Sequence, residues 1–126
     1  MMTKSEIGKI GESAVCEYLI NQGYNILVRN YRIKGGEIDI IAENGSYLAF
    51  VEVKTRKPDS LVTGYEAINK RKKSLIIKTA VDYCCKNPCV LQPRFDVAQV
   101  IFNGVRICSI DYIKNAYDTT GYKFIF

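Results

Sequence analysis

The sequence predicts an α/β fold in which a mixed central sheet is flanked by helices. Three observations predict this class. A helical apolar periodicity covers residues 5–22, three strand-like runs follow between residues 24 and 55, and a second helical stretch separates them from further strands. The expected order is helix, three strands, helix and strand, with an extra strand near the C-terminal end. The 126 residues suit one domain, spanning 1–126, with one core.

The first helix is expected to start at Ser5 as N-cap and to end before Gly23. No full capping box is expected, because a glycine, Gly8, lies three residues after Ser5. Gly8 and Gly11 fall on the apolar face, where each costs roughly 1 kcal/mol relative to Ala. Close approach to another backbone is the expected reason. Glu12 lies at the rim of this face, where a carboxylate can face a cleft, although solvated helix acids share this spacing.

An Asn-Gly dipeptide, Asn44-Gly45, lies between two apolar runs over residues 36–43 and 46–55. This is the strongest short-range signal of a β-hairpin. A two-residue loop at the dipeptide fixes the register of the two strands. The predicted pairs are Glu43 with Ser46, Ile41 with Leu48, Asp39 with Phe50 and Glu37 with Glu52.

Three acids and a lysine interrupt these apolar strands. Side-chain alternation puts Glu37, Asp39, Glu52 and Lys54 on one face. Asp39 and Glu52 are predicted diagonal neighbours, about 7–8 Å apart at the backbone, so that one ion can lie between their carboxylates. Glu37 opposite Glu52 is unfavourable unless something positive lies between them. A hydrated divalent cation suits such acids in a chain without histidine.

The second helix is expected to start at Tyr65 or Ala67 and to end at Lys86, before an Asn-Pro pair. Lys72 falls in the middle of its apolar face. Such a lysine either extends its ammonium group to the edge of the face or reaches an acid or a phosphate. Both interpretations remain open. The inward face is predicted to contain Ile68, Leu75, Ile76, Thr79, Ala80 and Tyr83.

Two further strands are predicted over residues 94–102 and 105–111, joined by an Asn-Gly turn. Asp96 is another acid in an apolar run, and pairing with Arg94 or another nearby base is the simpler interpretation. Residues 112–116 fit a helical turn. The aromatic end of the chain either covers the sheet or contacts another copy of the chain, so a homo-oligomer remains open.

Residue usage excludes several kinds of active site. The sequence has no histidine, which excludes Ser/His and Cys/His catalytic arrangements and histidine-based zinc hydrolase sites. The five cysteines are odd in number and lack C-x-x-C spacing, so free thiols are expected. No apolar run approaches the roughly 20 residues that span a membrane. The first residues lack the apolar core of a signal peptide, and a cytoplasmic location is expected.

The net charge of +5 permits an acidic partner, and the distribution of bases is more informative. The basic residues gather in clusters that flank or follow the hairpin, although solvated surfaces often carry such runs. The clusters are Arg29, Arg32 and Lys34; Lys54, Arg56 and Lys57; and Lys70, Arg71, Lys72 and Lys73.

Several of these motifs occur together in a recognisable pattern. The chain resembles the YraN-like, endonuclease-related family of the restriction-endonuclease-like PD-(D/E)xK superfamily over about residues 5–100. The usual Pro-Asp of that superfamily is Ile38-Asp39 here, so this motif depends on Asp39. The residues that carry the resemblance are Gly8, Gly11-Glu12, Gly36-Glu37-Ile38-Asp39, Phe50-Val51-Glu52-Val53-Lys54-Thr55-Arg56, Glu66-Ala67-Ile68, Lys72 and Arg94-Phe95-Asp96-Val97.

The resemblance implies a restriction-endonuclease-like core and a Mg²⁺- or Mn²⁺-dependent nuclease that hydrolyses DNA phosphodiesters. An endonuclease and a nuclease like those that resolve Holliday junctions both fit. Asp39, Glu52 and the Val53 carbonyl would bind the metal, Lys54 would hold the attacking water or the phosphate, and Glu12 would complete the site. Neither a membrane nor a small-molecule cofactor is expected. The expected DNA contacts are Arg32, Arg56, Lys57, Lys70, Arg71 and Lys72.

Two other interpretations remain. The first is a nucleic-acid-binding protein that has the nuclease-like fold but no catalytic activity. The second is a structural network of ion pairs, Asp39 and Glu52 with Lys54 and Lys72, in a protein that binds another protein. Three intact active-site residues favour the nuclease, because carboxylates near phosphates repel and a binding module does not need them.

Overall fold

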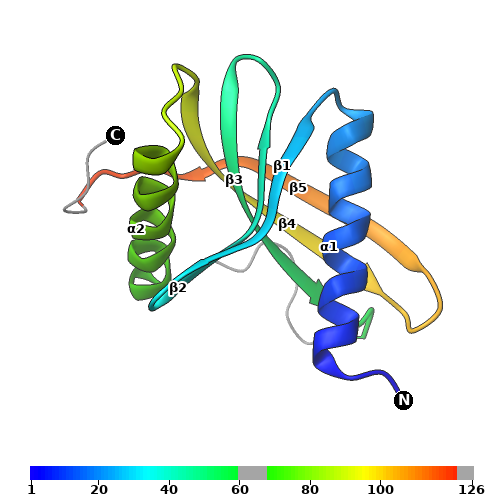
Figure 1. The fold of residues 1–126 in the computed structure, drawn as a ribbon. Coiled ribbons are helices and arrows are strands. Elements are labelled where there is room, and N and C mark those ends of the chain that lie inside the picture. Colours follow the sequence, from blue (N-terminus) through cyan, green and yellow to red (C-terminus); the bar gives the residue numbers. More distant parts are fainter. Residues whose placement is uncertain (60–67, 122–126) are drawn as a thin grey trace.

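A computed structural model describes residues 1–59 and 68–121 of the chain. One five-stranded sheet, in the order β1-β2-β3-β4-β5, lies between helices α1 and α2 (Figure 1). The pairs are antiparallel except β3 with β4, which is parallel. The predicted α/β class and order of elements are confirmed. The elements are α1 (Lys4–Asn21), β1 (Asn25–Ile33), β2 (Gly36–Glu43), β3 (Tyr47–Arg56), α2 (Lys70–Lys86), β4 (Gln92–Phe102) and β5 (Ile107–Tyr117).

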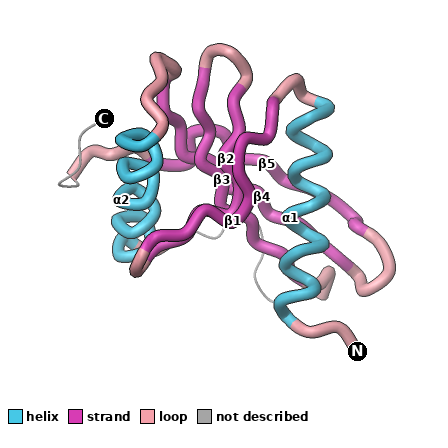
Figure 2. Tube along the Cα trace, in the orientation of Figure 1, coloured by secondary structure: helices cyan, strands magenta, loops and turns pink. Residues whose placement is uncertain are grey.

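The helices cover opposite faces of the sheet, as the coloured trace in Figure 2 also shows. Each face has its own hydrophobic core, so the central strands are apolar on both sides. The core under α2 includes Ile41, Phe50, Ile77, Tyr83 and Phe95. The core under α1 includes Val15, Leu19, Ile40, Val51 and Val100.

The N-cap of helix α1 lies two residues earlier than predicted. Thr3, not Ser5, is the N-cap, and this makes Glu6 the third residue of the helix. The Thr3 hydroxyl accepts a hydrogen bond from the Glu6 N–H at 3.1 Å, and the Glu6 carboxylate accepts one from the Thr3 N–H at 2.9 Å. The prediction that no capping box forms was therefore wrong.

The two glycines of α1 differ in their surroundings. A Cβ on Gly11 would lie 1.9 Å from the Thr55 hydroxyl oxygen, so α1 packs closely on β3 at this point. Gly11 therefore does lie at a close approach, but its neighbour is a side chain and not the predicted backbone. A Cβ on Gly8 would meet nothing within 4 Å among the residues that the structure describes, and the prediction was wrong there.

The β2–β3 hairpin has a different register from the predicted one. Glu43 pairs with Leu48, and Ile41 pairs with Phe50. The predicted pairings of Glu43 with Ser46 and of Ile41 with Leu48 were wrong. For each residue of β2, the partner on β3 lies two residues further along the chain than predicted. Because the shift is even, the paired residues 40–43 of β2 keep their predicted faces of the sheet.

The side chain of Asn44 explains this shift. Its amide oxygen accepts hydrogen bonds from the N–H groups of Ser46 and Tyr47, at 3.0 and 2.8 Å. The Asn44 N–H donates to the Tyr47 carbonyl at 3.2 Å. Gly45 has a φ of 90°, which a primed turn needs at its first central residue. The loop is therefore Gly45-Ser46, one residue further along than expected.

The new register also changes the neighbours of the acids. The last pair in the hairpin is Ile40 with Val51, so Asp39 and Glu52 are each the next residue beyond it. The predicted pairs of Asp39 with Phe50 and of Glu37 with Glu52 were wrong. Glu37 instead pairs across the other edge of β2 with Arg32, and the two side chains form an ion pair.

Helix α2 connects β3 to the parallel strand β4. Asn69 is its N-cap and accepts a hydrogen bond from the Lys72 N–H at 2.8 Å. The predicted starts at Tyr65 and Ala67 lie outside the described residues, and the predicted end at Lys86 is confirmed. The buried residues of the helix are Ile76, Ile77, Thr79, Ala80 and Tyr83.

Strand β5 continues to Tyr117, so the predicted helical turn over residues 112–116 was wrong. Pairing with β4 keeps the segment extended, with Ile113 opposite Val97 and Tyr117 opposite Phe95. The ring of Tyr117 stacks on that of Phe95, with 5.3 Å between ring centroids. The aromatic end of β5 thus contributes to the core under α2.

The five cysteines are free thiols, as expected. Within residues 1–59 and 68–121, no helix combines the length and apolar character needed to cross a bilayer.

Candidate active site

The hairpin brings two buried acids into contact. Asp39 on β2 and Glu52 on β3 are each 8% exposed. One Asp39 oxygen accepts a hydrogen bond from the Val53 N–H at 2.8 Å. The carboxyl groups of Asp39 and Glu52 lie close enough to form a hydrogen bond with each other when one of them carries a proton.

The contact changes the acidity of Asp39. Burial raises the pKa of Asp39, and the negative charges of Glu52 and Glu12 raise it further, to about 8. The hydrogen bond from the Val53 N–H acts in the opposite direction without overcoming them. A carboxyl group of this kind remains protonated near neutral pH unless a positive charge comes close to it.

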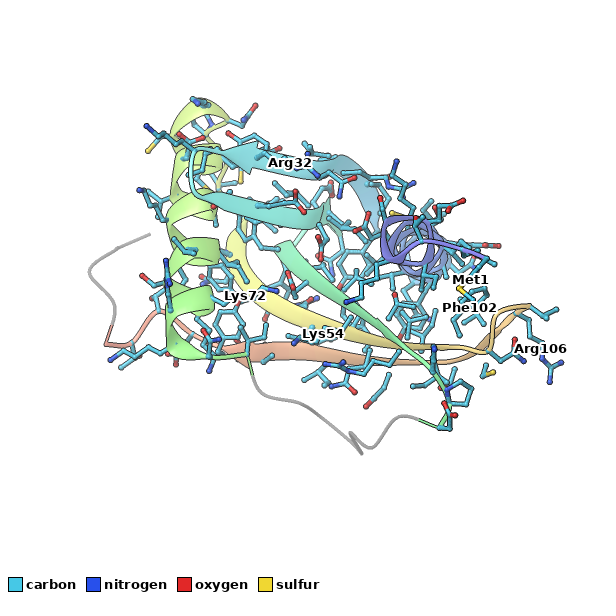
Figure 3. The ribbon with its side chains drawn as sticks, turned by 90° about the horizontal axis from the view of Figure 1, so that it is seen from below. Met1, Arg32, Lys54, Lys72, Phe102 and Arg106 are labelled. Carbon is cyan, nitrogen blue, oxygen red and sulfur yellow. The ribbon has the colours of Figure 1, made fainter. Side chains whose placement is uncertain are left out.

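Lys72 reaches from α2 to this pair of acids. Its ammonium nitrogen lies 2.6 Å from Glu52 Oε1. Figure 3 shows Lys72 between α2 and the sheet, with Lys54 on the neighbouring part of β3. Of the two interpretations open for Lys72, the structure selects contact with an acid. The second helix therefore contributes a base to a site whose acids come from the hairpin.

Glu12 reaches the same place from α1. One of its carboxylate oxygens accepts a hydrogen bond from the Asn30 side-chain amide at 3.1 Å. Asn30 has a φ of 54°, a left-handed conformation that asparagine tolerates better than most residues. Sequence reasoning missed Asn30, because an asparagine at the end of a predicted strand gives no signal of either its conformation or its partner.

An open pocket of about 510 Å³ joins these side chains. The pocket lies between the first turns of α2, the β1–β2 turn and the diverging ends of β2 and β3. Val53 lies in its wall, beside the acids. The charged residues that line it are Glu12, Arg32, Glu37, Asp39, Glu52 and Lys72.

Lys54, predicted to act beside the acids, is not among the described residues that line the pocket. Burial lowers the pKa of its ammonium group, and the positive charges of Lys72 and Arg56 lower it further, against the opposing effect of Glu52. Lys54 is therefore close enough to Glu52 and to Lys72 to respond to their charges.

The predicted DNA contacts do not form one cluster. Arg32 lies at the edge of the acid pocket, Lys70 and Arg71 are exposed at the start of α2, and Arg56 and Lys57 line a second hollow. Within the described part of the chain, no group of three or more His, Cys, Asp or Glu side chains is arranged to hold a metal ion. The acid pair is thus the core of the candidate site.

A second buried acid, Asp96 on β4, has a complete set of partners. Arg94 donates to both of its oxygens, at 2.9 and 2.8 Å. The Tyr112 hydroxyl and the Asn115 N–H donate to it at 2.6 and 2.9 Å. Arg94 also donates to the Tyr24 hydroxyl. The predicted pairing of Asp96 with Arg94 is confirmed, and its role is structural.

Fold and site together define an α/β protein with a mixed sheet, in which a hairpin holds two buried acids in contact beside a lysine from the crossover helix. Comparison with known proteins then gives the family. The chain belongs to the uncharacterised protein family UPF0102, which matches residues 11–100. The matched part contains all the residues that line the acid pocket.

Relatives match over nearly their full length. A UPF0102 protein of Clostridium botulinum (strain 657 / Type Ba4) is 45% identical over 115 residues, which cover 89% of this chain and 94% of the relative. One of Alkaliphilus metalliredigens (strain QYMF) is 42% identical over 117 residues, covering 92% of this chain and 100% of the relative. One of Trichlorobacter lovleyi is 40% identical over 116 residues, covering 89% and 90%.

Proposed function

We propose that this protein is a nuclease that uses Mg²⁺ or Mn²⁺ to hydrolyse DNA phosphodiester bonds. The observation that carries the proposal is the contact between the buried carboxyl groups of Asp39 and Glu52 in an open pocket. Buried acids in contact repel unless a proton or a cation lies between them. The YraN-like and PD-(D/E)xK resemblance of the same residues adds support.

The residues present fit a divalent cation. Two carboxylates adjoin a solvent-accessible pocket, and Mg²⁺ commonly takes one or two carboxylates and keeps several waters. The Val53 carbonyl is a candidate for a further oxygen ligand. When bound, such an ion supplies positive charge for the scissile phosphate and an acidified water.

The other charged groups have separate roles in this proposal. Glu12, held by Asn30, orients water at the far side of the acid pair. Lys72 neutralises Glu52 in the free protein and is within reach of a phosphate once that acid has another partner. Lys54 has an ammonium group with a lowered pKa, which suits contact with the attacking water or with the phosphate.

A second candidate is a nucleic-acid-binding protein with a nuclease-like fold and no catalytic activity. The specific observation in its favour is the ion pair of Lys72 with Glu52, which occupies one oxygen of a predicted metal ligand. This candidate predicts salt-sensitive DNA binding without cleavage in any divalent metal.

The test is cleavage of supercoiled, linear, single-stranded and branched DNA with Mg²⁺ or Mn²⁺. Asp39→Asn and Glu52→Gln should each lower the rate by at least about a hundredfold, since each removes a charge from the reacting site. Asp111→Asn is the matched control, because Asp111 is an exposed acid on β5. Failure of the wild type to cut any of these DNAs, or equal cutting by the Asp39 and Glu52 variants, would contradict the proposal.

A further inference from the structure

Within residues 1–59 and 68–121, Gly8 has no neighbour that requires a glycine. It lies inside α1, where glycine costs about 1 kcal/mol relative to alanine. Its neighbour in the same stripe, Gly11, is required because any Cβ would overlap Thr55. At Gly8 a Cβ would meet nothing within 4 Å in the described part of the chain, and its φ is not in the left-handed region. The missing side chain therefore leaves space rather than relieving a clash.

That space belongs to a large hollow beside α1. The hollow measures about 790 Å³ and lies between the start of α1, the end of β3 and the β4–β5 turn. Its size is within the range of roughly 300–1,000 Å³ that is usual for small-molecule sites. Ile7, Val53 and Phe102 supply apolar wall, and Phe102 lies beside the N-terminal part of α1 (Figure 3).

Basic residues form part of the wall of this hollow. Lys4, Arg56 and Lys57 line the hollow together with one acid, Asp59. An apolar interior with a mainly basic rim suits a ligand that has a flat apolar part and an attached anion. A nucleotide has both, because its base can stack on apolar and aromatic side chains while its phosphate pairs with lysine and arginine.

The hollow adjoins the acid pocket. Val53 lines both of them, and its N–H also donates to Asp39. A DNA strand with a phosphodiester at the acid pair therefore has its neighbouring nucleotide close to the hollow. A base can enter such a space only when it is unpaired, because a paired base stays in the duplex stack.

We propose that this hollow is a binding site for one unpaired nucleotide of a DNA strand, next to the phosphodiester that lies at the acid pair. The inference rests on the proposed nuclease function for its choice of ligand. It makes single-stranded ends, gaps and branch points the preferred substrates over continuous duplex. Gly8 serves the site by leaving room for the base.

The test is to introduce a larger side chain at Gly8 on α1, so that it occupies the hollow. Gly8→Leu places a side chain into the open space and also favours the helix, while Gly8→Ala is the matched control that adds a single methyl group. Binding is measured in EDTA, by fluorescence anisotropy, with a blunt duplex and with the same duplex carrying a short single-stranded overhang. Gly8→Leu should weaken binding to the overhang probe by about tenfold and leave the blunt duplex unchanged, because only the unpaired base loses its stacking.

Equal binding of the overhang probe by Gly8→Leu and the wild type would overturn the site. Equal weakening for both probes would also overturn it, because the effect would not depend on an unpaired base. Binding of neither probe by the wild type would also overturn the site, whereas the nuclease is decided by cleavage with metal present.

Cleavage assays separate the two proposals. Gly8-dependent binding without any cleavage in Mn²⁺ would support the nucleotide site and contradict the nuclease. If the wild type and Gly8→Leu cleave overhang substrates at the same rate, the result would support the nuclease and contradict the nucleotide site.

A second measurement does not depend on folding of the variant. Titration of wild-type protein with a short single-stranded oligonucleotide should shift the amide NMR signals of Gly8 and Gly104, which both line the hollow. Shifts confined to residues around the acid pocket would overturn the proposal.

Discussion

Two buried acids in this sheet, Asp96 and Asp39, differ in how their carboxyl groups are compensated. Asp96 is fully buried, and its partners all come from the chain itself: a bidentate arginine, a tyrosine hydroxyl and a backbone N–H. Asp39 receives one N–H, and its other contact is another acid, Glu52. The first cluster is closed by β4 and β5, while the second opens into a pocket.

The difference indicates which buried acids are structural. An acid whose hydrogen bonds and charge are satisfied internally stabilises one conformation and has no capacity for a further ligand. An acid held against a like charge beside solvent has an unmet demand for a proton or a cation. Both lie in apolar strands of the same sheet, so burial alone does not separate them.

The largest expected effect comes from breaking the closed cluster. Arg94→Met removes the bidentate partner and leaves the buried charge of Asp96 uncompensated. The free energy of unfolding should fall by about 3–5 kcal/mol, as is usual when one member of a buried ion pair is removed. Urea denaturation measures this. A loss below about 1 kcal/mol would mean that the cluster is not structural.

A smaller loss is expected from one hydrogen bond of the same cluster. Tyr112→Phe removes the hydroxyl that donates to Asp96 and keeps the ring that stacks on Tyr18 at 5.4 Å. Because the acceptor is charged, the free energy of unfolding should fall by about 1.5–3 kcal/mol. Tyr47→Phe is the control, since the Tyr47 ring packs on Arg94 and keeps that contact in the variant. Equal losses for the two variants would remove the special role of the Asp96 network.

The acid pair of Asp39 and Glu52 should make the stability of the protein depend on pH. The pKa of Asp39 is 3.8 in an ordinary environment and about 8 in the folded protein, so the folded state keeps a proton that the unfolded chain has lost. The free energy of unfolding of the wild type should therefore fall as the pH rises from about 4 to about 8. In Asp39→Asn this pH-dependent part of the free energy of unfolding disappears, and the variant should be more stable than the wild type at pH 8.

The measurement is chemical denaturation of both proteins across this range, without divalent metal. Below about pH 4 the two should converge in their dependence on pH, because Asp39 is then protonated in both states of the wild type. A wild type that becomes more stable between pH 4 and 8, relative to Asp39→Asn, would contradict the raised pKa.

The smallest expected effect concerns Lys72. Its ammonium group competes with a cation for Glu52, so Lys72→Met should tighten Mn²⁺ binding by a factor of about three to ten. Lys78→Met is the matched control, because Lys78 is an exposed lysine on the same helix. Calorimetric titration measures both. Unchanged or weaker Mn²⁺ binding in Lys72→Met, relative to the control, would show that Lys72 does not occupy the metal position.

Much of the fold could be predicted from periodicity and turn residues, and the errors have local causes. The hairpin at Asn44 was evident, but its register depended on the hydrogen bonds of the Asn44 side chain, which an Asn-Gly pair does not specify. The strand over residues 112–116 was missed because its partners, above all Asp96, come from another strand.

The candidate site was predictable to a similar extent. Alternation along the strands predicted Asp39 and Glu52 on one face, and in the structure both acids line the same pocket. The contact of Lys72 with Glu52 depends on how α2 packs, and the sequence left it open. The hydrogen bond of Asn30 to Glu12 joins β1 to α1 and has no signal in either segment.

The central claim is that Asp39 and Glu52 together hold a divalent cation. Calorimetric titration with Mn²⁺ at pH 8 tests it directly, using wild type, Asp39→Asn and the exposed-acid control Asp111→Asn. Wild type and Asp111→Asn should bind one Mn²⁺ ion with the same affinity. Asp39→Asn should bind the ion at least about tenfold more weakly. Equal binding by all three proteins, or no binding by the wild type, would contradict the account.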